Sequence, residues 1–190
     1  MNSYRIRVGS TMVFKIPRTM EIEHEELHSK LRKGTTEKGS IGRPAKKLAT
    51  VMHPHFVKEE DFALPPPGLL PSLSKDKATP DMKDILLMTD KLKVELNQML
   101  KEHEEILGAL EKLAASAKKE NKFEHLRFGE KLTLHAQTEE EIYYPTAMLV
   151  GEYMKLKLSR ESAKTSNKRG STKTSAAQGR RTRQQDSMVG

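Results

Sequence analysis

One pattern of histidine and glutamate, written H-x-x-x-E-E, occurs twice in this chain, each time with a proline ten residues after the histidine. The first copy runs from His55 to Pro65 and the second from His135 to Pro145. The doubled pattern indicates an internal repeat, in which two similar structural units each carry the same polar side chains.

The second copy lies on a stripe of residues that share one face of a predicted helix. Its members recur at steps of four, three, four and three residues, in the order Phe128, Leu132, His135, Glu139 and Ile142. His135 and Glu139 therefore point where core side chains point. A carboxylate that faces a core is costly unless it is paired or binds a metal, so the stripe marks both residues as candidate ligands.

Each copy also has a histidine upstream in a matching setting. His24 precedes His55 by 31 positions and His103 precedes His135 by 32. The unit H…HxxxE thus occurs twice, and its candidate metal ligands are His24, His55, Glu59, His103, His135 and Glu139. A polar layer without metal is the alternative, and it is disfavoured because every buried polar atom in it would need a hydrogen-bond partner.

The residue types limit which metal such a site would take. The chain contains no cysteine, so disulfides, thiolate metal sites and thiol catalysis are excluded. Four imidazoles and two carboxylates suit two ions, with two histidines on each ion and carboxylates that can bridge. Positions would stay open for water, dioxygen or another small ligand, and a nitrogen and oxygen donor set of this kind points to non-haem iron.

Hydrophobic periodicity predicts four main helices and a shorter fifth piece. Their approximate ranges are 19–33, 43–62, 79–118, 122–144 and 146–158, with a proline-rich irregular connection over 63–79. Two helix pairs that each carry one H…HxxxE unit pack most simply as an antiparallel four-helix bundle. We therefore predict an all-α fold whose metal-binding domain spans 17–158, with the short extra helix at its C-terminal end.

The net positive charge of the chain lies in its two tails. Residues 159–190 contain eight basic and two acidic residues and few apolar ones, which predicts a disordered basic tail. This tail could contact nucleic acid, but it lacks aromatic residues for base stacking, so a solubilising role is favoured. Residues 1–16 show no clear periodicity and are predicted to be flexible.

Neither a membrane segment nor a secretory signal is predicted. No apolar run approaches the roughly 18 residues that a membrane span needs. The N-terminus also lacks the apolar core, about 7–15 residues long, of a secretory signal. A cytoplasmic location is therefore the default expectation.

For the histidines outside the doubled unit, the sequence gives weaker evidence of metal binding. His28 could be a fifth histidine ligand, but a place outside the ligand set is favoured. His53 and His125 fall off the core stripes of their helices and are predicted to be exposed.

Residues next to the candidate ligands have two interpretations each. Glu60 and Glu140 could orient ligand histidines or face solvent. Tyr143 or Tyr144 could donate a hydrogen bond near the site, although ordinary packing is favoured. Ile142 is expected to flank the ligands and to limit the access of water.

Residues 17–158 resemble the hemerythrin-like (HHE cation-binding) family. The resemblance rests on Glu23-His24-Glu25-Glu26-Leu27, His53-Pro54-His55-Phe56 with Glu59-Glu60, Glu102-His103, and His135 with Glu139-Glu140 and Tyr144-Pro145. It implies a four-helix bundle that holds a non-haem di-iron centre, with two iron ions bound by the six candidate ligands. It also implies a role in binding dioxygen or in sensing oxygen, nitric oxide or iron.

We therefore expect a di-iron protein that binds or senses dioxygen or a related ligand such as nitric oxide, or that handles iron. The first alternative is an enzyme with oxidase-like or peroxidase-like activity at the same centre. The ligand set is poorer in carboxylates than glutamate-rich di-iron sites, which favours ligand binding over catalysis. The second alternative is a nucleic-acid-associated protein that acts through its basic tail.

Overall fold

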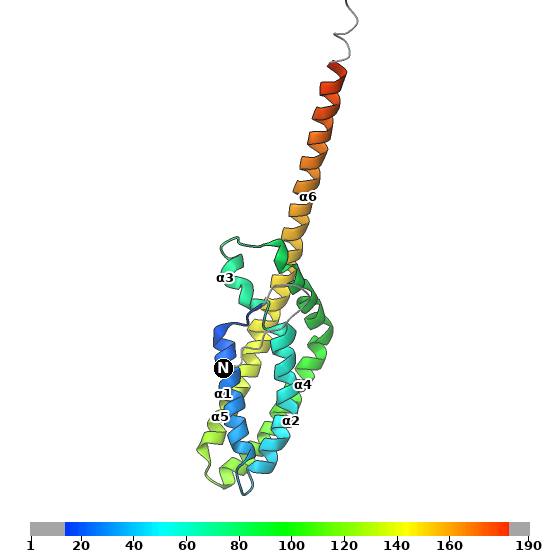
Figure 1. The fold of residues 1–190 in the computed structure, drawn as a ribbon. Coiled ribbons are helices and arrows are strands. Elements are labelled where there is room, and N and C mark those ends of the chain that lie inside the picture. The colour runs from blue at the N-terminus through cyan, green and yellow to red at the C-terminus, as the bar shows by residue number, and fades with distance from the viewer. Residues whose placement is uncertain (1–13, 183–190) are drawn as a thin grey trace, which may run out of the picture.

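Helices account for all the regular structure in the described part of this protein. The computed structural model describes residues 14–182, and no strand occurs within this range. Figure 1 shows the long helices, which are α1 (Arg18–Thr35), α2 (Gly42–Lys58), α4 (Ile85–Lys119), α5 (Phe123–Thr138) and α6 (Tyr144–Thr182). The prediction of an all-α fold is confirmed.

Short helical elements connect the long helices. Two are π-helical turns, η1 (Glu59–Ala63) and η4 (Glu139–Tyr143), and each begins at a predicted ligand. The others are the 3-10 turns η2 (Pro67–Leu69) and η3 (Pro80–Asp84) and the single α-helical turn α3 (Leu70–Leu73). A π turn adds one residue to a helical turn, and such insertions are frequent at functional sites.

The helices pack around α4, the central element of the fold. It contacts α2, α5 and α6, while α1 packs on α2 and α5. In Figure 1, α1, α2, α4 and α5 run side by side, and α6 continues from α5 past the end of this group. Five helices therefore share the core, because α6, which begins close to the predicted shorter fifth piece, also packs on α4.

Two apolar clusters fill the core, one on each side of the layer formed by the six predicted ligands. One cluster includes Phe62 and Met99, and the other includes Phe56 and Ile106. Met99 and Ile106 belong to different clusters and lie on either side of His103 along α4. The polar layer is thus closed on both sides by apolar side chains.

The helix α1 shows how the local sequence produces these elements. Pro17 precedes its first residue, where a missing backbone N–H does no harm. Arg32 and Lys33 lie in its last turn, next to the partial negative charge of the helix C-terminus. Its buried face has helical spacing and consists of Met20, His24, Leu27, Leu31 and Gly34.

The connection between α2 and α4 packs on the helices. Its leucines Leu64, Leu69 and Leu73 are buried, whereas Leu70 is largely exposed. The segment is more regular than expected, since it contains η2 and α3. Burial of the three leucines favours a compact connection over a loose loop.

Both ends of the chain differ from the sequence prediction. Phe14 belongs to the segment predicted to be flexible, yet its side chain is buried in an apolar cluster; the rest of the prediction for residues 1–13 lies outside the described range. The helix α6 continues to Thr182, through most of the segment 159–190 predicted to be disordered, and projects beyond the other helices (Figure 1). Residues 159–182 contain no proline, the residue that most strongly interrupts a helix.

None of the helices in the described range is long and apolar enough to cross a membrane.

Gly151 sets the close approach of α6 to α4. A methyl group at this position would overlap the side chain of Thr89, whose Cβ would lie 2.8 Å from the added carbon. We expect Gly151→Ala to lower the free energy of unfolding by about 1–3 kcal/mol, the usual cost of overpacking a core. Denaturant unfolding followed by circular dichroism measures this change.

Gly108 provides the matched control within α4. No atom lies within 4 Å of a methyl group added there. Gly108→Ala should therefore raise the free energy of unfolding by about 0.5–1 kcal/mol, because alanine restricts the unfolded chain more than glycine does. Equal tolerance of the two substitutions would contradict the close packing of α4 and α6.

Candidate metal centre

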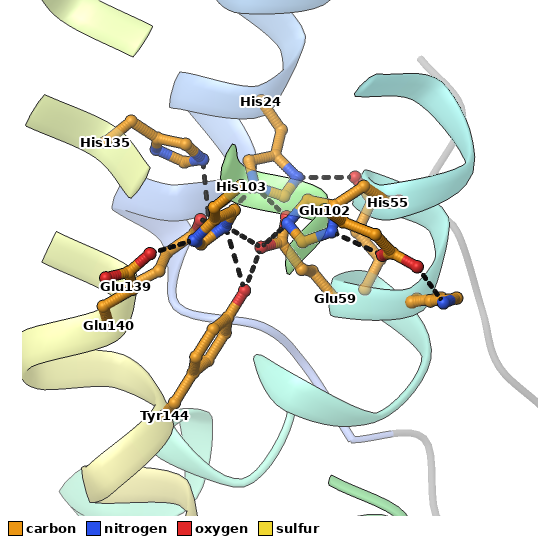
Figure 2. Close-up of polar contacts among 11 residues, drawn as sticks. His24, His55, Glu59, Glu102, His103, His135, Glu139, Glu140 and Tyr144 are labelled. Atoms are coloured by element: carbon orange, nitrogen blue, oxygen red, sulfur yellow. Dashed lines mark hydrogen bonds and ion pairs between the residues drawn. The ribbon is translucent and has the colours of Figure 1, made fainter. Parts of the chain in front are cut away.

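All six predicted ligands converge in one buried polar layer (Figure 2). The structure takes one histidine from each of α1, α2, α4 and α5 and one glutamate from each π turn, namely His24, His55, His103, His135, Glu59 and Glu139. Each of these residues is at most 2% exposed. Residues far apart in the sequence thus meet at one place in the fold.

The two oxygens of Glu59 face different histidines. Its Oε1 lies 2.9 Å from Nε2 of His55 and 3.7 Å from Nε2 of His103. Its Oε2 lies 3.6 Å from Nε2 of His24. One carboxylate therefore contacts two separate groups of imidazoles.

The two oxygens of Glu139 also face different histidines. Its Oε1 lies 3.1 Å from Nε2 of His135 and 3.6 Å from Nε2 of His24, while its Oε2 lies 3.4 Å from Nε2 of His103. Two groups result, and they share both glutamates. We call the group with His55 and His103 the first subsite, and the group with His24 and His135 the second subsite.

Both subsites have the dimensions of a cation site. In each, one donor atom from each of the four residues lies within 4.8 Å of the others. Bonds of about 2.1 Å from a metal to nitrogen or oxygen, at angles of about 90–110°, place neighbouring donor atoms roughly 3.0–3.4 Å apart. The contacts of 2.9 to 3.7 Å between carboxylates and imidazoles bracket this range.

Most of the donor atoms in the two subsites have no hydrogen-bond partner among the described residues. The buried atoms without a partner include both oxygens of Glu139, Oε2 of Glu59 and Nε2 of His24, His55 and His135. The remaining two donor atoms, Glu59 Oε1 and His103 Nε2, contact the hydroxyl of Tyr144. Buried polar atoms are nearly always paired in native proteins, and a cation in each subsite would satisfy these atoms together.

An outer glutamate faces the Nδ1 atom of each ligand histidine. Nδ1 of His24 lies 2.9 Å from Oε1 of Glu60, and Nδ1 of His103 lies 2.7 Å from Oε1 of Glu140. A proton on Nδ1 that is donated to a carboxylate fixes the ring and leaves Nε2 free to bind a metal. Of the two interpretations of Glu60 and Glu140, the structure supports the one in which they orient histidines.

The other two histidines face glutamates that precede a ligand histidine in the sequence. Nδ1 of His55 lies 2.9 Å from Oε2 of Glu102, whose other oxygen accepts a hydrogen bond of 2.5 Å from Lys58. Nδ1 of His135 lies 3.4 Å from Oε2 of Glu23 and makes no hydrogen bond. The sequence analysis missed Glu23 and Glu102, although the shared Glu-His pair could have indicated them.

Tyr144 is also part of the site, where the sequence analysis favours ordinary packing. Its hydroxyl donates a hydrogen bond of 2.5 Å to Oε1 of Glu59 and lies 3.4 Å from Nε2 of His103. An α-helix would place Tyr144 about 140° away from Glu139, five residues earlier. The π turn η4, with its hydrogen bond between these two residues, brings them to the same face.

The same π turn moves Ile142 away from the site. Its side chain is predicted to flank the ligands, but it is 56% exposed. The prediction is wrong because α-helical spacing does not hold across η4, so the residue that faces the core after Glu139 is Tyr144 instead.

Carboxylates dominate the electrostatics of the polar layer. Burial opposes the protonation of His24 and His103, but contacts with Glu139 and other glutamates outweigh it and raise the pKa of each to about 10. The other two ligand histidines also have raised pKa values. Burial would raise the pKa of Glu59, but His55 and other imidazoles lower it well below its usual value. A cation entering the site therefore has to displace protons.

His28 and His53 lie outside both subsites. The half-buried ring of His28 packs edge-on against Phe56 and His53, with ring centroids 5.0 and 5.6 Å away. Burial lowers the pKa of His28. His53 is exposed, as the sequence predicts.

His125 is buried, so the prediction that it is exposed is wrong. Its side chain is 5% exposed, and its Nε2 lies 2.7 Å from Oε1 of Glu37. The cause is a tertiary contact, because the start of α5 packs against the connection between α1 and α2. Glu124 completes a third group of possible ligands, but Glu37 is already paired with Lys122 at 3.3 Å. This group is therefore explained by ion pairing.

Comparisons with known proteins add no assignment to this site. No family model, no curated protein and no solved structure matches the chain. Any function therefore has to be inferred from the two subsites themselves.

The raised histidine pKa values predict that the stability of the metal-free protein depends on pH. The pKa of His24 and of His103 is about 10 in the folded protein, against about 6.5 in an unfolded chain. A group shifted in this direction stabilises the fold fully below the lower value and loses its contribution as the pH rises through the higher one. We expect the Tm of protein kept in excess chelator to fall from about pH 7 to about pH 10.

Two variants test the origin of this pH dependence. His103→Gln should flatten the decrease in Tm, because it removes one of the two strongly shifted groups. The matched change His53→Gln, at an exposed position outside the subsites, should leave the slope unchanged. A Tm that rises over the same interval would contradict the assignment of raised pKa values.

Proposed function

We propose that this protein is a hemerythrin-like, non-haem di-iron protein that binds or senses dioxygen or a related small ligand such as nitric oxide. The observation that carries the proposal is the sharing of Glu59 and Glu139 between two groups of histidines. Each glutamate directs one oxygen to each subsite, which is the arrangement expected for carboxylates that bridge two cations.

The donor set supports iron as the metal. The two subsites together offer imidazole nitrogen and carboxylate oxygen, and the chain has no thiolate that would favour a softer metal. Paired carboxylate-bridged irons in the cores of helical bundles are built from side chains of this kind on facing helices. When bound, the iron pair would supply open coordination positions and redox chemistry for a small ligand.

The surroundings of the subsites support a small, uncharged ligand. The apolar residues next to the ligand layer are all buried and include Leu27, Phe56, Phe62, Met99, Ile106 and Leu132. Their side chains restrict the access of water and present an apolar lining, which suits a small, uncharged ligand better than a large polar substrate. A diatomic molecule meets both conditions.

Iron stoichiometry tests the metal part of the proposal. We expect anaerobic loading of the chelator-treated protein with Fe²⁺, followed by elemental analysis, to give about two irons per chain, one for each four-residue subsite. His55→Ala and His135→Ala each remove a ligand from one subsite and should each retain about one iron. Glu59→Ala removes a ligand from both and should retain close to none.

His53→Ala is the matched control for these variants. His53 lies two residues before His55 on the same helix, but it is exposed and belongs to neither subsite, so its removal should leave about two irons per chain. Iron content near zero in the wild-type protein would exclude the proposal, whatever the variants show.

Stopped-flow absorption tests the ligand part of the proposal. Mixing the reduced, iron-loaded protein with dioxygen or nitric oxide should produce a new charge-transfer band that is lost in His103→Ala. The absence of any spectral change would indicate a closed site with a structural or iron-storing role. Rapid, repeated turnover of hydrogen peroxide would instead favour the enzymatic alternative.

A further inference from the structure

The two subsites differ in how their histidines are supported, although both arise from the same sequence repeat. In the first subsite, His55 and His103 both have an outer carboxylate at hydrogen-bond distance from Nδ1, at 2.9 and 2.7 Å. In the second, His24 has such a contact at 2.9 Å, whereas Nδ1 of His135 lies 3.4 Å from Glu23 and has no hydrogen-bond partner in the part of the chain that the structure describes. One ligand of the second subsite is therefore held less firmly.

A lysine explains the firm position of Glu102. Lys58 donates a hydrogen bond of 2.5 Å to one oxygen of Glu102 and leaves the other to face His55. The matching position in the second repeat is Thr138, whose hydroxyl donates to the carbonyl of Leu134 in its own helix. The two repeats therefore differ at Lys58, the residue that holds the outer carboxylate of Glu102 in place.

Glu23, the counterpart of Glu102, has no equally close cation within residues 14–182. Lys131 is its nearest lysine, at 4.0 Å, and that lysine makes its short contact with Glu26 instead. The Glu23 side chain is about twice as exposed as that of Glu102, at 31% against 17%. Both observations agree with the missing hydrogen bond to His135.

Tyr144 adds a second, independent difference. Its hydroxyl donates to Oε1 of Glu59, the oxygen that belongs to the first subsite. The matching residue in the first repeat is Leu64, which has no donor, and both oxygens of Glu139 are without a hydrogen-bond partner. Tyr144 therefore orients Glu59, which belongs to both groups, with its Oε1 toward the first subsite.

The aromatic ring next to the second subsite is purely apolar, whereas the ring that stacks on His103 of the first subsite, with centroids 5.8 Å apart, carries the Tyr144 hydroxyl. Phe56 stacks on His24 with ring centroids 4.0 Å apart, and its centroid lies 5.4 Å from that of His135. The matching residue in the second repeat is Ala136. An apolar wall makes it costlier to place a charged ion in the second subsite and gives an uncharged ligand a favourable surface there.

We propose that the two subsites bind cations with unequal affinity: the first subsite fills first and retains its cation, whereas the second subsite holds the weaker, exchangeable cation. This inference rests on the proposed function, because it assumes that both subsites take iron. Hydrogen bonds to Nδ1 make an imidazole a stronger and better oriented ligand, so the fully supported pair of histidines should bind more tightly.

Anaerobic titration of the metal-free, full-length protein with Fe²⁺, in competition with a chelating dye, tests this order. We expect two binding constants that differ by at least about tenfold, the usual effect of an outer hydrogen bond on a metal ligand. Glu102→Ala should weaken the tighter constant by about 10–100-fold. The matched change Glu23→Ala should leave the tighter constant unchanged, because Glu23 faces His135 of the second subsite. The weaker constant should also change little, because no hydrogen bond to His135 is lost.

Substitution of a ligand histidine shows which subsite each binding constant belongs to. This test remains informative if Glu102→Ala fails to fold. His103→Ala should abolish the tighter constant and keep the weaker one, and His135→Ala should do the reverse. Loss of the tighter constant in His135→Ala would overturn the proposed order. Tyr144→Phe keeps the ring but removes the hydroxyl, and it should weaken the tighter constant more than the weaker one.

The titration also separates this inference from the proposed function. Two indistinguishable constants in the wild-type protein would overturn the unequal subsites and leave the di-iron proposal standing. No Fe²⁺ binding at all would overturn both. Equal weakening by Glu23→Ala and Glu102→Ala would show that the outer carboxylates do not set the difference.

Discussion

Two buried carboxylates impose the main physical constraint on this structure. Glu59 and Glu139 lie between two apolar clusters, where water does not reach them. A charge in such a place is tolerated only when other groups compensate it, so α1, α2, α4 and α5 each supply an imidazole at the same level. The packing of the helices around α4 therefore has to satisfy a polar layer as well as fill an apolar core.

The two π turns connect this constraint to the local backbone. Each begins at one of the buried glutamates and changes which later residues face the core. In η4 the change brings Tyr144 to Glu59 and sends Ile142 to the surface. Because η4 has one extra residue in its turn, the hydrogen-bond donor Tyr144 faces the core where regular α-helical spacing would place the aliphatic Ile142.

An internal repeat produces a site with approximate twofold character, and a few departures from the repeat make its halves unequal. The departures lie around the ligands and not among them, at Lys58, Phe56 and Tyr144. They alter hydrogen bonding and polarity while the donor atoms stay the same. Two sites with the same ligands can therefore have different properties within one fold.

The sequence by itself determined the helical class, the main helices and the six residues that meet in the polar layer, because helical spacing and the doubled unit are local properties of the chain. Tertiary structure decided the rest. Which histidines share a subsite, which glutamates face Nδ1, and why His125 is buried all depend on contacts between helices that are distant in sequence. The place of Tyr144 depends on the π turn, and periodicity based on regular α-helix cannot anticipate a change in the number of residues per turn.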